Sequence, residues 1–171
     1  MGSKNKLKRF NQNKTFSNVI QPEREEVTSG DFQYKGKWNS SFFKKEQPLV
    51  VELGCGKGEY SVYLAQQYPE KNFVGVDIKG ARFWAGAKES LELGLPNVAF
   101  LRTQIELIED VFAEDEVDEI WITFPDPQIK FKRTKHRLTN PQFLARYQKI
   151  LKADGKIHLK TDSEFLHGYT L

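Results

Sequence analysis

Sulfur-containing residues and long apolar runs are nearly absent from this chain. Its 171 residues include one cysteine, Cys55, and one methionine. A single cysteine excludes a disulfide within the chain, and three scattered histidines beside it form no metal-ligand pattern. No apolar run approaches the ~20 residues of a membrane-spanning helix, and the N-terminus lacks the apolar core of a signal peptide. We therefore expect a cytoplasmic protein with no membrane span and no metal site.

Lysine and arginine barely outnumber the acids, 26 against 23, but the two signs occupy different segments. Five basic residues and no acid fall within positions 1–14, whereas positions 106–119 contain eight acids and no base. Positions 130–137 contain five lysines and arginines, with His136 among them. A near-neutral chain with this distribution can present a basic face to a polyanion. The acidic run is more simply a solvated surface.

Length and composition predict one globular domain preceded by an extension. With 39% hydrophobic residues, a chain of 171 residues can bury about 70% of its extended surface. Positions 1–44 are polar, basic at first and without a steady period, and we interpret them as an N-terminal extension. Within it, Trp38, Phe42 and Phe43 are spaced to pack as one short helical face. Positions 45–171 form the main domain.

From Leu49 onward, strand patterns alternate with helix patterns, which predicts an α/β fold with a parallel, doubly wound sheet. His158 is expected to be a surface residue of the last strand. Asn140 and Pro141 are typical of an N-cap followed by a first-turn proline. Strands are expected at 49–53, 73–77, 97–101, 117–124 and 156–161. Helices are expected at 59–68, 81–93, 106–112 and from 141 onward.

Three alternating glycines, Gly54, Gly56 and Gly58, follow the first predicted strand. Glycine lets a backbone approach a ligand without a steric cost. The second strand ends on Asp77, whose carboxylate can accept two hydrogen bonds from a ribose diol. A strand, a glycine loop, a helix and a strand-terminal acid are typical of a nucleotide-type site. The alternatives are a dinucleotide site and a loop that merely turns the chain.

The glycine spacing is E-x-G-x-G-x-G, with Glu52 still on the strand and Glu59 where a dinucleotide fold has its third glycine. This spacing resembles motif I of the S-adenosylmethionine (SAM) methyltransferases. The resemblance implies a Rossmann-like, doubly wound methyltransferase sheet with SAM as the cofactor. A carboxylate near the loop suits the cationic methionine end of SAM.

The fourth predicted strand leads into Pro125-Asp126-Pro127. In a doubly wound sheet the ends of the first and fourth strands flank the switch in strand order, so Asp126 should face the glycine loop. Two prolines restrict the backbone on either side of it, which makes Asp126 the catalytic candidate. An ordinary turn aspartate is the alternative. The basic run that begins at Lys130 would contact phosphates beside this point, so nucleic acid is the expected substrate.

Five segments together resemble the bacterial tRNA (guanine-N7)-methyltransferases, in the order of that family and over roughly two thirds of the chain. They are ELGCGKG at 52–58, GVDIK at 75–79, FPDP at 124–127, RLT at 137–139 and HLKTD at 158–162. The resemblance implies methyl transfer from SAM to N7 of the variable-loop guanine of tRNA.

The same resemblance implies roles for particular residues. Asp126 would be catalytic, and Lys130 and Asp162 would contact the guanine side of the tRNA. The residues that would bind SAM are Glu52, Gly54, Gly56, Asp77, Gln104 and Asp126.

Two departures from the family pattern leave alternatives open. Gln128 stands where the family commonly has tryptophan. The family's later T-x-x-E substrate element and the last two sheet strands are expected to lie outside this chain, which would then be truncated after strand five. The alternatives are a SAM-dependent methyltransferase of another substrate and a non-catalytic module that binds tRNA or SAM. The sequence is compatible with a monomer and with a homodimer.

Overall fold

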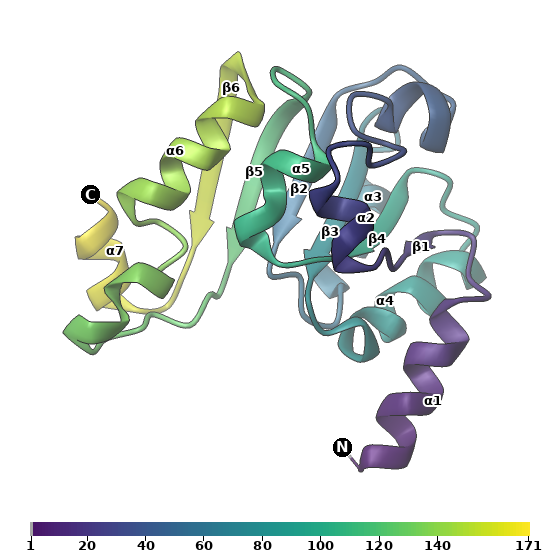
Figure 1. Cartoon of the computed structure of the whole chain (residues 1–171), viewed down its shortest axis with the longest axis horizontal. Coiled ribbons are helices and arrows are strands. Elements are labelled where there is room, and N and C mark those ends of the chain that lie inside the picture. The colour runs from purple at the N-terminus through teal and green to yellow at the C-terminus, as the bar shows by residue number, and fades with distance from the viewer. Residues whose placement is uncertain (1) are drawn as a thin grey trace.

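The computed structural model describes residues 2–171, apart from the side chain of Ser3, and contains a six-stranded sheet (Figure 1). The strands are β1 (Val19–Ile20), β2 (Leu49–Leu53), β3 (Asn72–Asp77), β4 (Val98–Arg102), β5 (Val117–Thr123) and β6 (Leu151–Lys160). The α-helices are α1 (Ser3–Asn13), α2 (Arg24–Thr28), α3 (Glu59–Gln67), α4 (Gly80–Glu92), α5 (Ile108–Val111), α6 (Pro141–Ile150) and α7 (Glu164–Thr170). There is also one π-helix, η1 (Trp38–Phe43), and there are two 3-10 helices, η2 (Ile105–Leu107) and η3 (Phe131–His136). None of the helices within residues 2–171 is long and apolar enough to cross a membrane.

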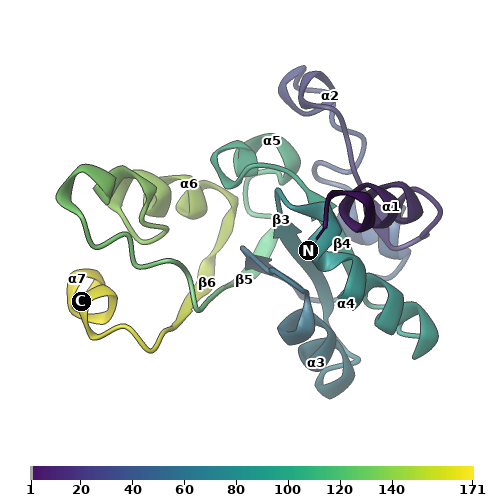
Figure 2. The ribbon, with the colours of Figure 1, turned by 90° about the horizontal axis from the view of Figure 1, so that it is seen from below.

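All neighbouring strands are parallel, in the order β1-β4-β3-β2-β5-β6, which confirms the predicted doubly wound sheet. From β2 the chain moves outward through β3 and β4, then crosses back so that β5 and β6 lie on the other side of β2. Figure 2 shows α3 and α4 on one face of the sheet and α2 and α5 on the other. Because the strand order reverses between β2 and β5, their carboxyl ends border the crevice in which such sheets bind ligands.

Alternate residues of β2 enter two different cores. Leu49, Val51 and Leu53 of β2 pack in the core that includes side chains of α5 and α6, whereas Val50 packs with α3 and α4. Because side chains alternate along a strand, Glu52 shares the face of Val50 and points toward α3. A carboxylate is thereby placed near the end of an otherwise apolar strand, next to the crevice.

The N-terminal segment contains regular structure that no sequence period indicated. Helix α1 packs along α4, and β1 pairs with β4. Asn13 is fully buried, and its side-chain amide donates to the Gly80 carbonyl at 2.8 Å and to Gln21 Oε1 at 3.1 Å. In η1, Trp38 is buried and donates from Nε1 to the Val111 carbonyl at 2.8 Å, so the short aromatic face expected there is confirmed.

Strand β6 begins earlier than the predicted strand at 156–161. Residues 117–119 of β5 span the same length as residues 151–156 of β6, so positions 152–155 form a bulge. Gly155 fits this bulge because a Cβ there would lie 2.9 Å from the Lys152 carbonyl oxygen. The turn signal before 156 therefore marks a bulge inside the strand and not its start.

The sequence suggested that His158 of β6 is a surface residue, but its side chain is about two thirds buried. Its ring stacks on Trp121 with centroids 4.2 Å apart, and its Nε2 lies 3.0 Å from a carboxylate oxygen of Glu119. Both partners belong to β5, so the contact depends on the register between two strands.

Helix α6 begins at the predicted N-cap. Asn140 Oδ1 accepts a hydrogen bond from the Phe143 N–H at 2.9 Å, and Pro141 occupies the first turn. The Asn140 amide also donates to the carbonyls of Lys135 at 3.0 Å and Thr134 at 3.3 Å. One buried side chain thus connects the start of α6 to the basic segment that precedes it.

We expect Asn140→Ala to lower the free energy of unfolding by about 1–2 kcal/mol, because it removes an N-cap and takes a donor from two carbonyls. Urea unfolding followed by circular dichroism measures this loss. Gln142→Ala, at an exposed position of the same helical turn, is the control and should change stability by less than about 0.5 kcal/mol. Equal midpoints for the two variants would contradict the role of Asn140.

Candidate functional site

The loop after β2 turns on three glycines in the left-handed region of backbone space. The φ angle is +70° at Gly54, +56° at Gly56 and +81° at Gly58, where a residue with a Cβ is strained. The Gly54 N–H donates to the Val76 carbonyl at 2.8 Å, which attaches the turn to β3. At Gly58 a Cβ would also lie 2.5 Å from the Phe100 ring. The predicted glycine loop is therefore a tight turn that requires glycine.

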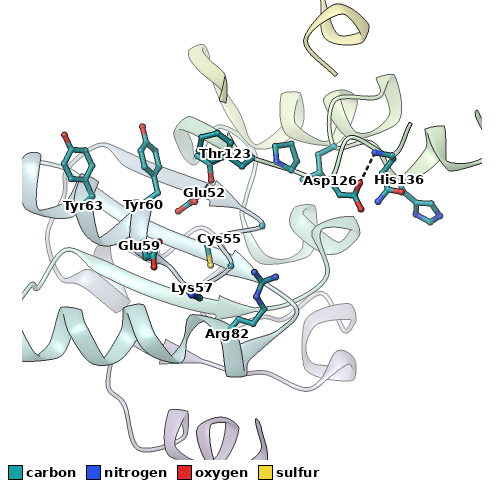
Figure 3. A pocket seen from close by; sticks show the side chains of 16 residues that line it. Glu52, Cys55, Lys57, Glu59, Tyr60, Tyr63, Arg82, Thr123, Asp126 and His136 are labelled. Carbon is teal, nitrogen blue, oxygen red and sulfur yellow. Dashed lines mark hydrogen bonds between the residues drawn. The ribbon is translucent and has the colours of Figure 1, made fainter. Parts of the chain in front are cut away.

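Glu52 lies buried beside this turn. Its two carboxylate oxygens accept hydrogen bonds from the hydroxyls of Ser61 on α3 (2.5 Å) and Thr123 at the end of β5 (2.6 Å). Figure 3 shows Glu52 and Thr123 close together at one wall of the cavity. Burial raises the pKa of Glu52, because desolvation of the charged form outweighs the two hydroxyl donors. A ligand cation next to Glu52 would favour the ionised carboxylate.

Asp77, at the end of β3, is oriented by two backbone donors. The Gly56 N–H donates to Oδ2 at 3.0 Å, and the Lys79 N–H donates to Oδ1 at 2.8 Å. A carboxylate oxygen can accept more than one hydrogen bond, so each retains acceptor capacity toward a ligand. Asp77 therefore presents a fixed pair of acceptors, which suits a vicinal diol.

Two cavities adjoin at the carboxyl edge of the sheet. The larger, of about 760 Å³, extends from Glu52 past the glycine turn to Asp126 (Figure 3). The smaller, of about 280 Å³, contains Asp77 and Gln104 in its wall. The two share three lining residues, Gly54, His136 and Leu138. An extended ligand that occupies both cavities would therefore cross the glycine turn.

Asp126 lies on the loop after β5 and is exposed. It lines the larger cavity together with Gly54 and Gly56, as its predicted place at the strand end requires. Its Oδ1 accepts a hydrogen bond from the Gln128 N–H at 3.1 Å. The φ angle is +46° at Phe124 and +50° at Gln128, an unfavourable region for residues other than glycine. This strained backbone on both sides of Asp126 is typical of functional loops.

The structure separates the other predicted site residues. Gln104 is exposed beside the smaller cavity, and its Oε1 accepts a hydrogen bond from Arg24 of α2 at 2.5 Å. Lys130 and Asp162 are exposed, just before η3 and just after β6, and line neither cavity. They can act only on a molecule that extends beyond the two cavities.

Four residues of the site were not identified from the sequence. Ser61 and Thr123 orient Glu52, and a polar residue at the end of the strand beside β2 was the one available signal for Thr123. His136 belongs to the basic run but also lines both cavities. Arg82 of α4 lies in the wall of the larger cavity, with Nη2 3.5 Å from the place of a Cβ on Gly56.

The donor set matches SAM better than a metal ion. Asp77 offers two acceptors for a ribose diol, and Glu52 offers a buried carboxylate for a cationic group on the far side of the glycine turn. The turn itself has no Cβ at three positions, so a ligand can lie against its backbone. Among the described residues, no group of three or more His, Cys, Asp and Glu side chains is placed to ligate a metal.

Residues 46–170 match a protein family described as "Putative methyltransferase". The chain is 71% identical over 171 residues to a tRNA (guanine-N(7)-)-methyltransferase of Christiangramia forsetii, which covers 100% of this chain and 76% of that protein. It is 54% identical over 167 residues to the enzyme of the same name from Bacteroides fragilis, covering 98% of this chain and 66% of the relative. A Bacillus licheniformis enzyme of that name is 37% identical over 145 residues, which are 85% of this chain and 68% of that protein.

Solved structures share the fold at low sequence identity. A 16S rRNA (adenine(1408)-N(1))-methyltransferase from Catenulisporales acidiphilia, determined with its cosubstrate SAM, aligns with a TM-score of 0.59 at 19% identity over 72% of this chain and 60% of that one. The YcgJ protein of Bacillus aligns with a TM-score of 0.52 at 21% identity over 66% of this chain and 43% of that one. These likenesses show the Rossmann-like methyltransferase fold.

The match to the Christiangramia enzyme extends over all 171 residues of this chain, so it includes the N-terminal segment as well as the sheet. Identity of 71% is far above what a shared fold alone produces, as the structural neighbours at about 20% illustrate. The chain belongs to the tRNA (guanine-N(7)-)-methyltransferase family.

Proposed function

We propose that this chain transfers a methyl group from SAM to N7 of the variable-loop guanine of tRNA. The observation that supports this most directly is the larger cavity. Its lining includes both Asp126 and the glycine turn, and a basic segment lies beside it. The names of the relatives support the choice of tRNA over another substrate. They also favour an enzyme over a non-catalytic binding module. A tRNA substrate would also fit the cytoplasmic location expected from the sequence.

The residues of the two cavities would bind different parts of the cofactor. Asp77 and Gln104 would bind the ribose and adenine in the smaller cavity, and Glu52 would lie near the cationic methionine end in the larger one. When bound, SAM supplies an electrophilic methyl group on a positively charged sulfur. Gly54 and Gly56 would lie directly against the cofactor between its two halves.

Guanine N7 has an exposed lone pair, so no proton has to be removed before it reacts. The main task of the protein is then to place two reactants in line, which can supply ~7–11 kcal/mol of the barrier. The methylated purine gains a positive charge, and a carboxylate nearby stabilises that charge. Asp126 would accept hydrogen bonds from the guanine edge and offset the charge that develops.

The segment after Asp126 would bind the tRNA itself. Lys130, Lys132, Arg133 and Lys135 are all exposed on or beside η3, where they can contact phosphates. Phe131 is 92% exposed, which excludes a role as a core anchor and leaves its ring free to stack on a base. Lys130 and Asp162 would contact the guanine side of the substrate from outside the cavities.

We expect Asp126→Asn to lower kcat for tRNA methylation at least about a hundredfold, because the amide cannot offset the developing charge. The affinity for S-adenosylhomocysteine should change less than tenfold, since Asn retains the acceptor for the Gln128 N–H. A radiolabelled methyl-transfer assay on bulk tRNA and calorimetry measure the two effects. Asp154→Asn, at an exposed position of the β6 bulge, is the control. A near-normal rate for Asp126→Asn would refute this role.

Asp77→Asn should weaken binding of S-adenosylhomocysteine by about ten- to a hundredfold, because hydrogen bonds to a charged acceptor contribute ~1.5–3 kcal/mol. An amide NH₂ would also face one of the two backbone N–H donors that now orient the carboxylate. Calorimetry measures the dissociation constant. Affinity for tRNA in a filter-binding assay should stay unchanged, and a variant that binds the cofactor normally would place the ribose elsewhere.

Cofactor binding should depend on pH through Glu52. Burial raises the pKa of this carboxyl in the folded protein, so it ionises at a higher pH than an ordinary carboxyl. Because the ionised form attracts the cationic ligand, SAM affinity should rise with pH across that interval. The free energy of unfolding of the ligand-free protein should fall across the same interval, since the folded state then binds more protons than the unfolded state.

Calorimetric titrations of SAM at a series of pH values measure this effect. Glu52→Gln keeps a side chain of the same shape and should bind SAM more weakly, without the rise with pH that Glu52 produces. If the two proteins have parallel pH profiles, the buried carboxylate does not interact with the cofactor.

A further inference from the structure

Helix α1 packs against α4, on the edge of the sheet where β4 ends. Its last residue, Asn13, donates a buried hydrogen bond to the Gly80 carbonyl at 2.8 Å, at the first turn of α4. Gln12 Oε1 accepts a hydrogen bond from the Trp84 indole N–H at 2.9 Å. The basic N-terminal segment is therefore part of the folded body in this structure.

Two clefts lie along the two sides of α1, and each is lined by three cations. The first, of about 370 Å³, contains Lys6, Lys79 and Arg102. The second, of about 350 Å³, contains Lys8, Arg9 and Lys88. No carboxylate lines either cleft, and the first acid in the sequence is Glu23. Lys88 also forms an exposed ion pair with Glu92, at 3.7 Å.

Aromatic rings position several of these cations. The Arg9 guanidinium lies 4.5 Å and the Lys88 ammonium 5.3 Å from the centre of the Trp84 ring. The Arg102 guanidinium lies 5.2 Å from the centre of the Phe10 ring. A ring face attracts a cation without neutralising its charge, so Arg102 and Lys88 keep their positive charge at the cleft walls. Ordering them beforehand also lowers the entropy cost of binding.

The first cleft adjoins the cofactor cavities. Ile78, the residue after Asp77, lines both this cleft and the smaller cavity. The basic η3 turn lies on the other side of those cavities, and Figure 1 shows α1 and the segment between β5 and α6 projecting from opposite sides of the same edge of the sheet. Two separate cationic surfaces thus flank the candidate active site.

We propose that α1 and its two clefts form a second phosphate-binding surface for tRNA, opposite the basic η3 turn. The inference rests on the proposed function, because it assigns this surface to the same substrate. A polyanion that contacts both surfaces would lie across the larger cavity and be oriented over Asp126. A small phosphate-containing ligand would need only one cleft, whereas six cations spread over both sides of a helix match a backbone of regularly spaced charges.

The test is the double variant Lys6→Gln and Lys8→Gln, which removes one cation from each cleft and keeps residues with good helix propensity. The affinity for a tRNA transcript should fall on the order of tenfold near 0.1 M salt, and the slope of log Kd against log salt should decrease by about 1–2. S-adenosylhomocysteine affinity should stay unchanged, which excludes a general loss of folding.

The matched control is Lys44→Gln with Lys45→Gln. These two lysines are exposed and change the net charge equally, but they lie just before the amino end of β2, away from the carboxyl edge of the sheet. The inference is supported if only the α1 variant loses affinity and salt dependence. It is overturned if the α1 variant binds like the wild type, if both variants weaken equally, or if the wild type does not bind tRNA.

Because tRNA binding is measured without SAM, the binding experiment and the methylation assay test the second surface and the proposed reaction independently. A wild-type protein that binds tRNA through α1 but transfers no methyl group would refute the proposed reaction and leave the binding surface in place. A protein that methylates tRNA but binds it equally well without Lys6 and Lys8 would refute only the second surface.

Discussion

The geometry of the site depends on how closely the glycine turn approaches its neighbours. Gly58 packs against Phe100, and a Cβ on Gly86 of α4 would lie 2.7 Å from the Lys57 carbonyl oxygen. The Gly86 N–H donates to that same carbonyl at 2.9 Å. Gly86 therefore lets the backbones of α4 and the turn meet, and Gly58 leaves room for the Phe100 ring of β4. On the β3 side, the Gly54 N–H donates to the Val76 carbonyl and the Gly56 N–H donates to Asp77, so the same turn is attached to the strand that ends in the site.

Charged side chains surround the glycine turn in two layers. Buried or oriented carboxylates, Glu52 and Asp77, lie in the cavity walls, where a cationic ligand and a diol would find acceptors. Exposed cations lie outside, on η3 at one side and along α1 at the other. A methyl donor with a positive charge and a polyanionic acceptor need these opposite surroundings. The fold brings them together because the carboxyl ends of all its parallel strands meet at one edge.

Much of the fold was predictable from local pattern. Three features depend only on residues close in sequence: the apolar run at 49–53, the glycine spacing and the Asn140-Pro141 cap. The structure contains the corresponding strand, turn and helix cap. The elements that pattern missed depend on distant contacts. Strand β1 has only two residues and exists because it pairs with β4, and the bulge before Lys156 follows from the register with β5.

The family, the α/β class and the acids near the ends of β2 and β3 and in the loop after β5 could be read from the sequence, because they depend on the spacing of residues along the chain. The hydrogen bonds from Ser61 and Thr123 to Glu52, and the place of His136 in the lining of both cavities, became visible in the folded structure alone. The folded structure also shows that α1 docks on α4 and presents its cations beside the site. These contacts join residues far apart in sequence, and their geometry depends on strand order and helix packing, which no local spacing encodes.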